Sequence, residues 1–191
     1  MTARPIATTR SSAGLPTGKL AVWWVVVSEI VIFGGLLSSY IMYRLAHDAF
    51  AAQAAHTNMW IGAFNTLVLL SSSLTAVLAH QAAEAGDGKT AARRLWFTIG
   101  GAATFLIVKG FEWTGEITHG FTITSSTFWS FYYTAAGLHA LHVLAGGIIM
   151  AFVAVAAAKN MELHRVELIG IYWHFVDVVW IFLFPLLYIA K

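Results

Sequence analysis

The chain has 191 residues, of which 59% are hydrophobic and only 10% are charged, and its net charge is +2. Soluble domains carry roughly 25% charged residues, so the composition excludes an ordinary soluble protein, and the small net charge gives no reason to expect nucleic acid as a partner. The chain contains no cysteine, which excludes disulfides, thiolate metal sites and cysteine nucleophiles.

The sequence divides into a polar N-terminal tail and a series of long apolar segments. Residues 1–19 are polar and are expected to form a cytoplasmic tail. A signal peptide is not expected, because the apolar run behind them is too long. A transmembrane helix needs about 20 mostly apolar residues. Segments of this kind cover residues 20–43, 59–80, 95–113, 128–158 and 166–190. The sequence therefore predicts an all-α integral membrane bundle of five transmembrane helices over residues 20–191.

The positions of Lys and Arg predict the orientation of this bundle, because cytoplasmic loops of membrane proteins are enriched in both. One side carries most of them: Arg4, Arg10, Lys19, Lys89, Arg93, Arg94, Lys159 and Arg165. The other side carries only Arg44 and Lys191. We therefore expect the N-terminus in the cytoplasm and the C-terminus outside.

Aromatic residues near the ends of the spans are typical of belts at the two membrane interfaces. The inner belt is predicted to contain Trp23, Trp24, Trp96, Tyr172 and Trp173. The outer belt is predicted to contain Tyr40, Tyr43, Trp60, Trp113, Trp129, Tyr132, Tyr133 and Tyr188. Paired glycines at 34–35, 100–101 and 146–147 are expected to let helices approach closely, and Thr57–Asn58 and residues 125–127 to cap the second and fourth spans.

Ionisable residues inside the spans are candidates for function, because such groups are costly in a membrane. They are Glu29 in the first span, Lys109 and Glu112 in the third, His139 and His142 in the fourth, and His174 and Asp177 in the fifth. The helical rise of about 1.5 Å per residue places Glu29, His142 and Asp177 near mid-membrane, at heights that let them meet. The two histidines of the fourth span are three residues apart, as are His174 and Asp177, so each pair is expected to share a helix face.

Each of these groups has a functional and a structural interpretation. The histidines could ligate a metal or haem, although a pair on one helix does not supply the facing ligands of a bis-histidine haem, and hydrogen bonding between helices is preferred. Glu29 and Asp177 could handle protons, or could lock the bundle by bonding to His142 or His174. Lys109 and Glu112 are expected to form an ion pair at the outer edge of the third span. We predict no catalytic, metal-binding or cofactor-binding residue in this chain.

The fifth span resembles the closing helix of subunit III of haem-copper terminal oxidases, through residues 172–184 (YWHFVDVVWIFLF). Other segments match that family in the same order: residues 28–33 (SEIVIF), 65–72 (NTLVLLSS), 109–113 (KGFEW) and 137–143 (GLHALHV). The similarity extends from Val22 to Tyr188. It is to the short, five-helix bacterial form, since the first two helices of the longer members are missing.

This resemblance implies a non-redox accessory subunit of a cytochrome c oxidase-type respiratory complex, which reduces oxygen and translocates protons. It implies partnership with the catalytic subunit I and with subunit II, haem and copper in those partners rather than in this chain, and contacts with membrane lipids, including bound phospholipid. The implied location is the inner (plasma) membrane of a bacterial cell. The implied site residues are the intramembrane set Glu29, His139, His142, His174 and Asp177, with Glu112 at the outer edge.

Two alternatives stay open at this point. Quinol oxidases and nitric oxide reductases have related short subunits, which the motifs do not separate from the oxidase form. An independent haem b electron-transfer protein, with His139, His142 or His174 as ligands, belongs to a different class. A proton-coupled transporter is disfavoured, because the sequence has no internal repeat.

Overall fold

The computed structural model describes residues 14, 16–47 and 49–190, and the regular structure in this part of the chain is helical. The elements are α1 (Thr17–Ala46), α2 (Ala49–Ala54), α3 (Met59–Glu84), α4 (Gly88–Thr118), α5 (Thr127–Ala158) and α6 (His164–Phe184), which a π-helical turn (Pro185–Ile189) extends. Most of the predicted tail, including Arg4 and Arg10, lies outside the described residues, as does Lys191.

Five helices among the described residues are long and apolar enough to cross a membrane, namely α1, α3, α4, α5 and α6 with its extension. The predicted all-helical fold with five transmembrane helices is therefore confirmed. Helix α4 is longer than the segment 95–113, because helical hydrogen bonding continues beyond the apolar residues at both ends. The short helix α2 was not predicted.

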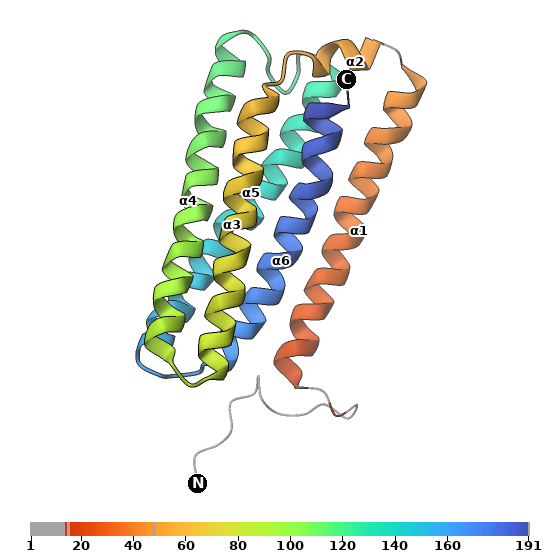
Figure 1. The fold of residues 1–191 in the computed structure, drawn as a ribbon. Coiled ribbons are helices and arrows are strands. Elements are labelled where there is room, and N and C mark those ends of the chain that lie inside the picture. The colour runs from red at the N-terminus through yellow and green to blue at the C-terminus, as the bar shows by residue number, and fades with distance from the viewer. Residues whose placement is uncertain (1–13, 15, 48, 191) are drawn as a thin grey trace.

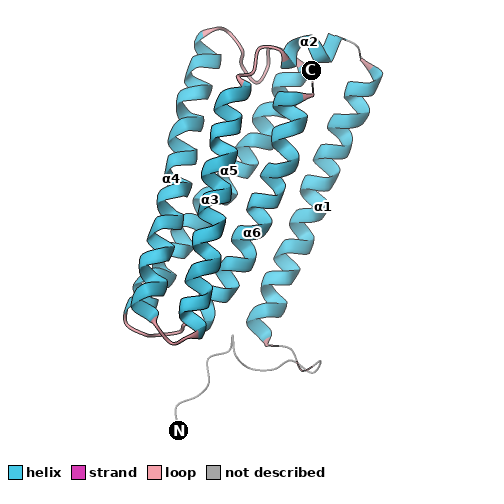
Figure 2. Ribbon diagram, viewed as in Figure 1, coloured by secondary structure: helices cyan, strands magenta, loops and turns pink. Residues whose placement is uncertain are grey.

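Helices α3, α4, α5 and α6 pack side by side, and α1 stands at one edge of the group, against α6 and α5 (Figure 1). The α3–α4 and α5–α6 connections lie at the same end of the bundle as the start of α1, and α2 and the C-terminus lie at the opposite end (Figure 2). Helix α1 buries only Val26, Phe33 and Tyr40. These residues are seven apart, so α1 contacts the bundle along one narrow seam.

Side-chain caps explain where three of the helices begin. Asn58 accepts hydrogen bonds from the backbone N–H groups of Trp60 (3.0 Å) and Ile61 (3.4 Å) at the start of α3. Asp87 accepts one from Thr90 (3.0 Å) at the start of α4, and Ser126 accepts one from Trp129 (3.5 Å) at the start of α5. Each cap satisfies backbone donors that the first turn of a helix leaves without an intrahelical partner.

Several of the aromatic residues predicted for the interfacial belts lie inside the bundle. Trp129, Tyr132, Trp173 and Tyr188 are fully buried between helices, which their predicted height in the membrane did not specify. Trp23, Trp24, Trp60 and Trp96 are exposed on the outside of the bundle, as belt residues should be. A lipid-facing side chain is as apolar as a core one, so the sequence alone does not tell the two positions apart.

Of the paired glycines predicted to allow close approach, Gly101 and Gly146 lie directly against a neighbouring helix. A Cβ atom on Gly101 would lie 2.7 Å from the Ser72 Cβ atom, so this glycine lets α4 approach α3. A Cβ atom on Gly146 would lie 3.1 Å from the ring of Trp173, so this glycine lets α5 approach α6. Gly34, Gly35 and Gly100 have open space beside them in this chain, which shows that only some of the paired glycines serve internal packing.

The chain ends in a turn that is wider than an α-helical turn. Pro185 has no N–H group to continue the ladder of α6, and the N–H of Ala190 donates to the Pro185 carbonyl (2.8 Å) in the i to i+5 pattern. The hydroxyl of Tyr40 donates to the Leu186 carbonyl (2.7 Å), and that of Thr57 donates to the Leu187 carbonyl (3.3 Å). Side chains from α1 and from the segment before α3 thus satisfy carbonyls at a helix end, where the helix itself supplies no donor.

Candidate functional site

Glu29 and His142 meet across the seam between α1 and α5. His142 Nε2 lies 3.0 Å from Glu29 Oε2, although the angles are outside those of a hydrogen bond. On the other side of the ring, Nδ1 lies 2.8 Å from the Leu138 carbonyl oxygen, so Nδ1 carries the proton and donates it there. The two groups can therefore share one further proton, which resides either on Nε2 or on the carboxyl group.

His174 and Asp177 lie on the side of α6 that faces the bundle interior, and only the histidine finds a partner. Ser73 of α3 has its Oγ 2.6 Å from His174 Nδ1. Asp177 is buried, and neither of its carboxyl oxygens has a hydrogen-bond partner among the described residues. The structure thus brings together Glu29 and His142 but does not bond Asp177 to either of them.

His139 is enclosed by aromatic rings. Its imidazole stacks on Trp180 at 5.1 Å between ring centroids and meets the edge of Phe105 at 5.4 Å. The side chain is fully buried, and neither ring nitrogen has a hydrogen-bond partner among the described residues. Although His139 and His142 are three residues apart, the first contacts α4 and α6 while the second contacts α1.

Lys109 and Glu112 form the centre of a buried polar cluster. The Lys109 ammonium donates to Glu112 Oε2 (2.9 Å) and to the hydroxyl oxygens of Tyr132 (3.0 Å) and Tyr188 (2.6 Å). The two tyrosine hydroxyls also contact Glu112 Oε1, at 3.2 and 2.8 Å. All three ammonium donors are therefore satisfied, and the cluster joins α4, α5 and the final turn.

A second carboxyl group lies one turn further along α4. Glu116 is 9% exposed, and its Oε1 has no hydrogen-bond partner among the described residues. Its Oε2 lies 3.4 Å from the Tyr133 hydroxyl, but that hydroxyl also lies 2.8 Å from the Phe121 carbonyl oxygen. A hydroxyl has a single proton to donate, and the shorter bond takes it. Glu116 therefore has one oxygen without a partner and one long hydrogen bond, from a hydroxyl that also bonds a carbonyl oxygen.

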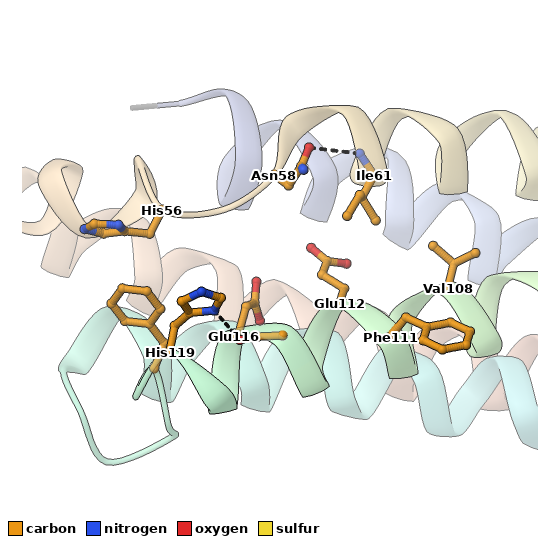
Figure 3. A pocket seen from close by; sticks show the side chains of 10 residues that line it. His56, Asn58, Ile61, Val108, Phe111, Glu112, Glu116 and His119 are labelled. Carbon is orange, nitrogen blue, oxygen red and sulfur yellow. Dashed lines mark hydrogen bonds between the residues drawn. The ribbon is translucent and has the colours of Figure 1, made fainter.

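Glu112 and Glu116 line a pocket of about 650 Å³ between the start of α3 and the last turns of α4. Both carboxyl groups project from α4 into the space below Asn58 and Ile61, and the rings of His56 and His119 lie at the end nearest the loops (Figure 3). Further along α4, away from the loops, Val108 and Phe111 make the lining apolar (Figure 3). The pocket thus combines an acidic end with an apolar side.

Comparison with known proteins decides the family. Residues 7–191 match the family model described as cytochrome c oxidase subunit III. The chain is 32% identical over 168 residues to cytochrome c oxidase subunit 3 of Thermostichus vulcanus, with 85% of this chain and 82% of that protein covered. It is 35% identical over 170 residues to the same subunit of Corynebacterium diphtheriae, with 85% and 83% covered. The chain belongs to the cytochrome c oxidase subunit III family.

A longer relative is also similar to this subunit III chain. The haem-copper oxidase subunit I+III of Aeropyrum pernix is 28% identical over 183 residues, which are 90% of this chain but only 22% of that protein. The name of that relative joins subunit I and subunit III.

Several polar residues of this subunit III bundle were not predicted from the sequence. Glu116 was missed because the third span was expected to end at Trp113, whereas α4 continues to Thr118. The spacing of four residues between Glu112 and Glu116 was a usable signal, since residues four apart on a helix share a face.

The sequence also did not predict the polar contacts of Tyr132 and Tyr188, which were assigned to the outer belt. Asn65 is fully buried, and its side-chain amide has no partner among the described residues.

Proposed function

We propose that this chain is the accessory, non-redox subunit III of a cytochrome c oxidase-type haem-copper oxidase in a bacterial cell membrane. The observation that carries this proposal is the family match over residues 7–191, which includes every helix of the bundle. The complex oxidises cytochrome c, reduces oxygen and translocates protons outward. This chain stabilises the catalytic subunit and contacts lipids, and it has no catalytic centre of its own.

Subunits I and II of the oxidase are the proposed partners. The fused subunit I+III of Aeropyrum pernix supports contact with subunit I, because fusion holds two chains in one assembly. Large exposed apolar residues on α1 support a membrane or partner contact there: Trp24, Val31, Met42 and Leu45 are between 67% and 81% exposed in the isolated chain. We include subunit II among the partners because cytochrome c is the electron donor that we propose for the complex.

Haem and copper are proposed to lie in the partner subunits. The contacts of the three intramembrane histidines support this assignment. The ring of His139 is enclosed by Trp180 and Phe105, and both nitrogens of His142 already face oxygen atoms. His174 Nδ1 is held by Ser73. We therefore assign these side chains, with Glu29 and Asp177, to an intramembrane polar set. Its Glu29–His142 and Ser73–His174 contacts join helices, while His139 and Asp177 have no hydrogen-bond partner among the described residues and can retain or lose a proton.

We further propose that the N-terminus is cytoplasmic and the C-terminus external. The described positive residues of the α3–α4 and α5–α6 connections and their flanking turns support this orientation, because they lie at the same end of the bundle as the start of α1. Lys89, Arg93 and Arg94 lie at the start of α4, and Lys159 and Arg165 lie around the α5–α6 connection.

Affinity purification with a visible spectrum tests this proposal. The full chain, tagged and purified in mild detergent, should bring with it a large haem-bearing subunit, and the haem absorbance should leave when that partner is stripped away. Oxygen consumption by the complex with reduced cytochrome c, but not with quinol, should identify the donor. A chain that is purified alone and still shows haem absorbance would contradict the proposal and favour the haem b alternative.

A further inference from the structure

With the imidazoles of His56 and His119 counted as neutral, the charges around the pocket of α3 and α4 do not balance. Lys109 is the one cation of the cluster and is 2.9 Å from Glu112, with both tyrosine hydroxyls completing its hydrogen bonds. Glu116 adds a second carboxyl group, whose Oε1 has no hydrogen-bond partner among the described residues and whose Oε2 has only a 3.4 Å contact with the Tyr133 hydroxyl, which also bonds the Phe121 carbonyl oxygen. A buried carboxylate without a partner is costly. The pocket therefore has room and charge for one additional cation.

The walls of the pocket indicate what kind of cation fits. Glu116 lies two residues before the end of α4, about 3 Å from it along the axis, whereas Val108 lies about 15 Å from that end. The pocket is therefore acidic near the helix end, where lipid headgroups lie, and apolar toward the membrane centre, where Val108 and Phe111 form its side. A bare metal ion needs several oxygen ligands at once, and Glu112 is already engaged with Lys109. A group with hydrogen-bond donors and an apolar tail matches this arrangement.

We propose that this pocket binds the primary ammonium headgroup of an aminophospholipid, with the ammonium donating to Glu116 and the adjoining apolar part of the lipid lying against Val108 and Phe111. The volume of about 650 Å³ is larger than one ammonium group needs and accommodates a headgroup with the first part of its chains. The inference deepens the lipid contacts proposed above. It rests on the membrane placement of the bundle and does not require the oxidase partners.

Two substitutions separate the charge of the site from its space. Glu116→Gln removes the negative charge and keeps the side-chain shape. Gly115→Leu fills the pocket and leaves both carboxyl groups in place, because a Cβ on Gly115 meets nothing within 4 Å. Matched controls are Glu84→Gln, an exposed carboxyl at the opposite end of the bundle, and Gly110→Leu, an open glycine of α4 that does not line the pocket.

The experiment counts bound lipids by native mass spectrometry on the full-length subunit, purified with whatever partners it retains. After delipidation, phosphatidylethanolamine or phosphatidylglycerol is added back, and soluble ethanolamine is added in a separate arm. We expect one phosphatidylethanolamine to be retained in preference to phosphatidylglycerol. Glu116→Gln should weaken its binding roughly tenfold through the loss of a charge-assisted contact. Gly115→Leu should weaken it by a similar factor because it fills the space of the headgroup, and both controls should bind the lipid as the unaltered chain does.

Each contrary outcome has a clear meaning. Equal retention of the two lipids, or equal retention by the unaltered chain and the pocket variants, would overturn the inference. Binding of soluble ethanolamine with no preference between the lipids would also overturn it, because a free amine would then be the ligand. Retention of phosphatidylethanolamine by a chain that brings no haem-bearing partner would support the inference while contradicting the oxidase proposal. A pocket variant that fails to fold is replaced by the other, since they alter different residues.

Discussion

At the scale of single residues, the buried charges of this bundle differ in how well they are compensated. Lys109 uses all three donors on Glu112, Tyr132 and Tyr188, whereas Glu116 and Asp177 have oxygens without donors among the described residues. Removing one partner of a buried, fully bonded ion pair lowers the stability of the fold strongly, because the charge of the other partner is left buried without compensation. The Lys109 cluster is therefore expected to be the most sensitive polar position of the bundle.

Replacing the cation of this cluster tests that expectation. Lys109→Met leaves Glu112 buried without its cation and should lower the free energy of unfolding by about 3–5 kcal/mol. The double variant Lys109→Met with Glu112→Gln should recover part of the loss, because no charge then remains unpaired. Unfolding in mixed detergent micelles, followed by tryptophan fluorescence, measures both. Lys89→Met, at an exposed position, is the control, and a Lys109→Met variant as stable as this control would refute the argument.

The Glu29–His142 contact leads to a prediction about the assembled oxidase. Glu29→Gln removes a site that can exchange a proton with His142 Nε2 at 3.0 Å. The variant should shorten the active lifetime of the enzyme during turnover or slow its proton uptake. Both are measured on the purified complex, by oxygen consumption over time and by pH-sensitive dyes in vesicles. Glu84→Gln serves as the control, and unchanged lifetime and uptake in Glu29→Gln would exclude a functional role for this contact.

At the scale of helices, the sequence predicts which segments are helical better than it predicts how their faces are used. The apolar runs predict five spans because a membrane requires about 20 apolar residues for each crossing. The ends of α4 could not be predicted in this way, because helical hydrogen bonding continues to Thr118 and brings the polar Glu116 into the helix. The burial of Trp129 and Tyr188 could not be predicted either, since lipid and protein interior favour the same apolar side chains.

Adjacent glycines of α4 provide a direct test of helix packing. Gly101→Val places a Cβ 2.7 Å from the Ser72 Cβ atom and should destabilise the bundle by about 1–3 kcal/mol through overpacking against α3. Gly100→Val adds the same side chain to open space and should cost clearly less. Thermal unfolding of the two variants in one detergent compares them. Equal loss of stability would mean that the close approach of α3 and α4 at Gly101 does not matter.

At the scale of the whole molecule, the chain offers a simple measurement of its orientation, because it contains no cysteine. A cysteine at exposed Ala85, between α3 and α4, is expected to face the cytoplasm, and one at exposed Thr124, between α4 and α5, is expected to face outside. In spheroplasts, a membrane-impermeant maleimide should label Thr124→Cys and spare Ala85→Cys. Inverted vesicles should give the opposite result. A reversed pattern would overturn the proposed orientation.

The narrow seam of α1 has a consequence for how the subunit is assembled. Each of the helices α3 to α6 has extensive contacts with two neighbours, whereas α1 buries only Val26, Phe33 and Tyr40, with partly buried neighbours and a few polar contacts beside them. We therefore expect the four-helix group to form first and α1, although it is synthesised first, to dock onto it last. Glu29 is carried on α1 and meets His142 only after docking. The contact between these two residues thus exists only in the completed subunit, and it is lost when α1 separates from the other helices.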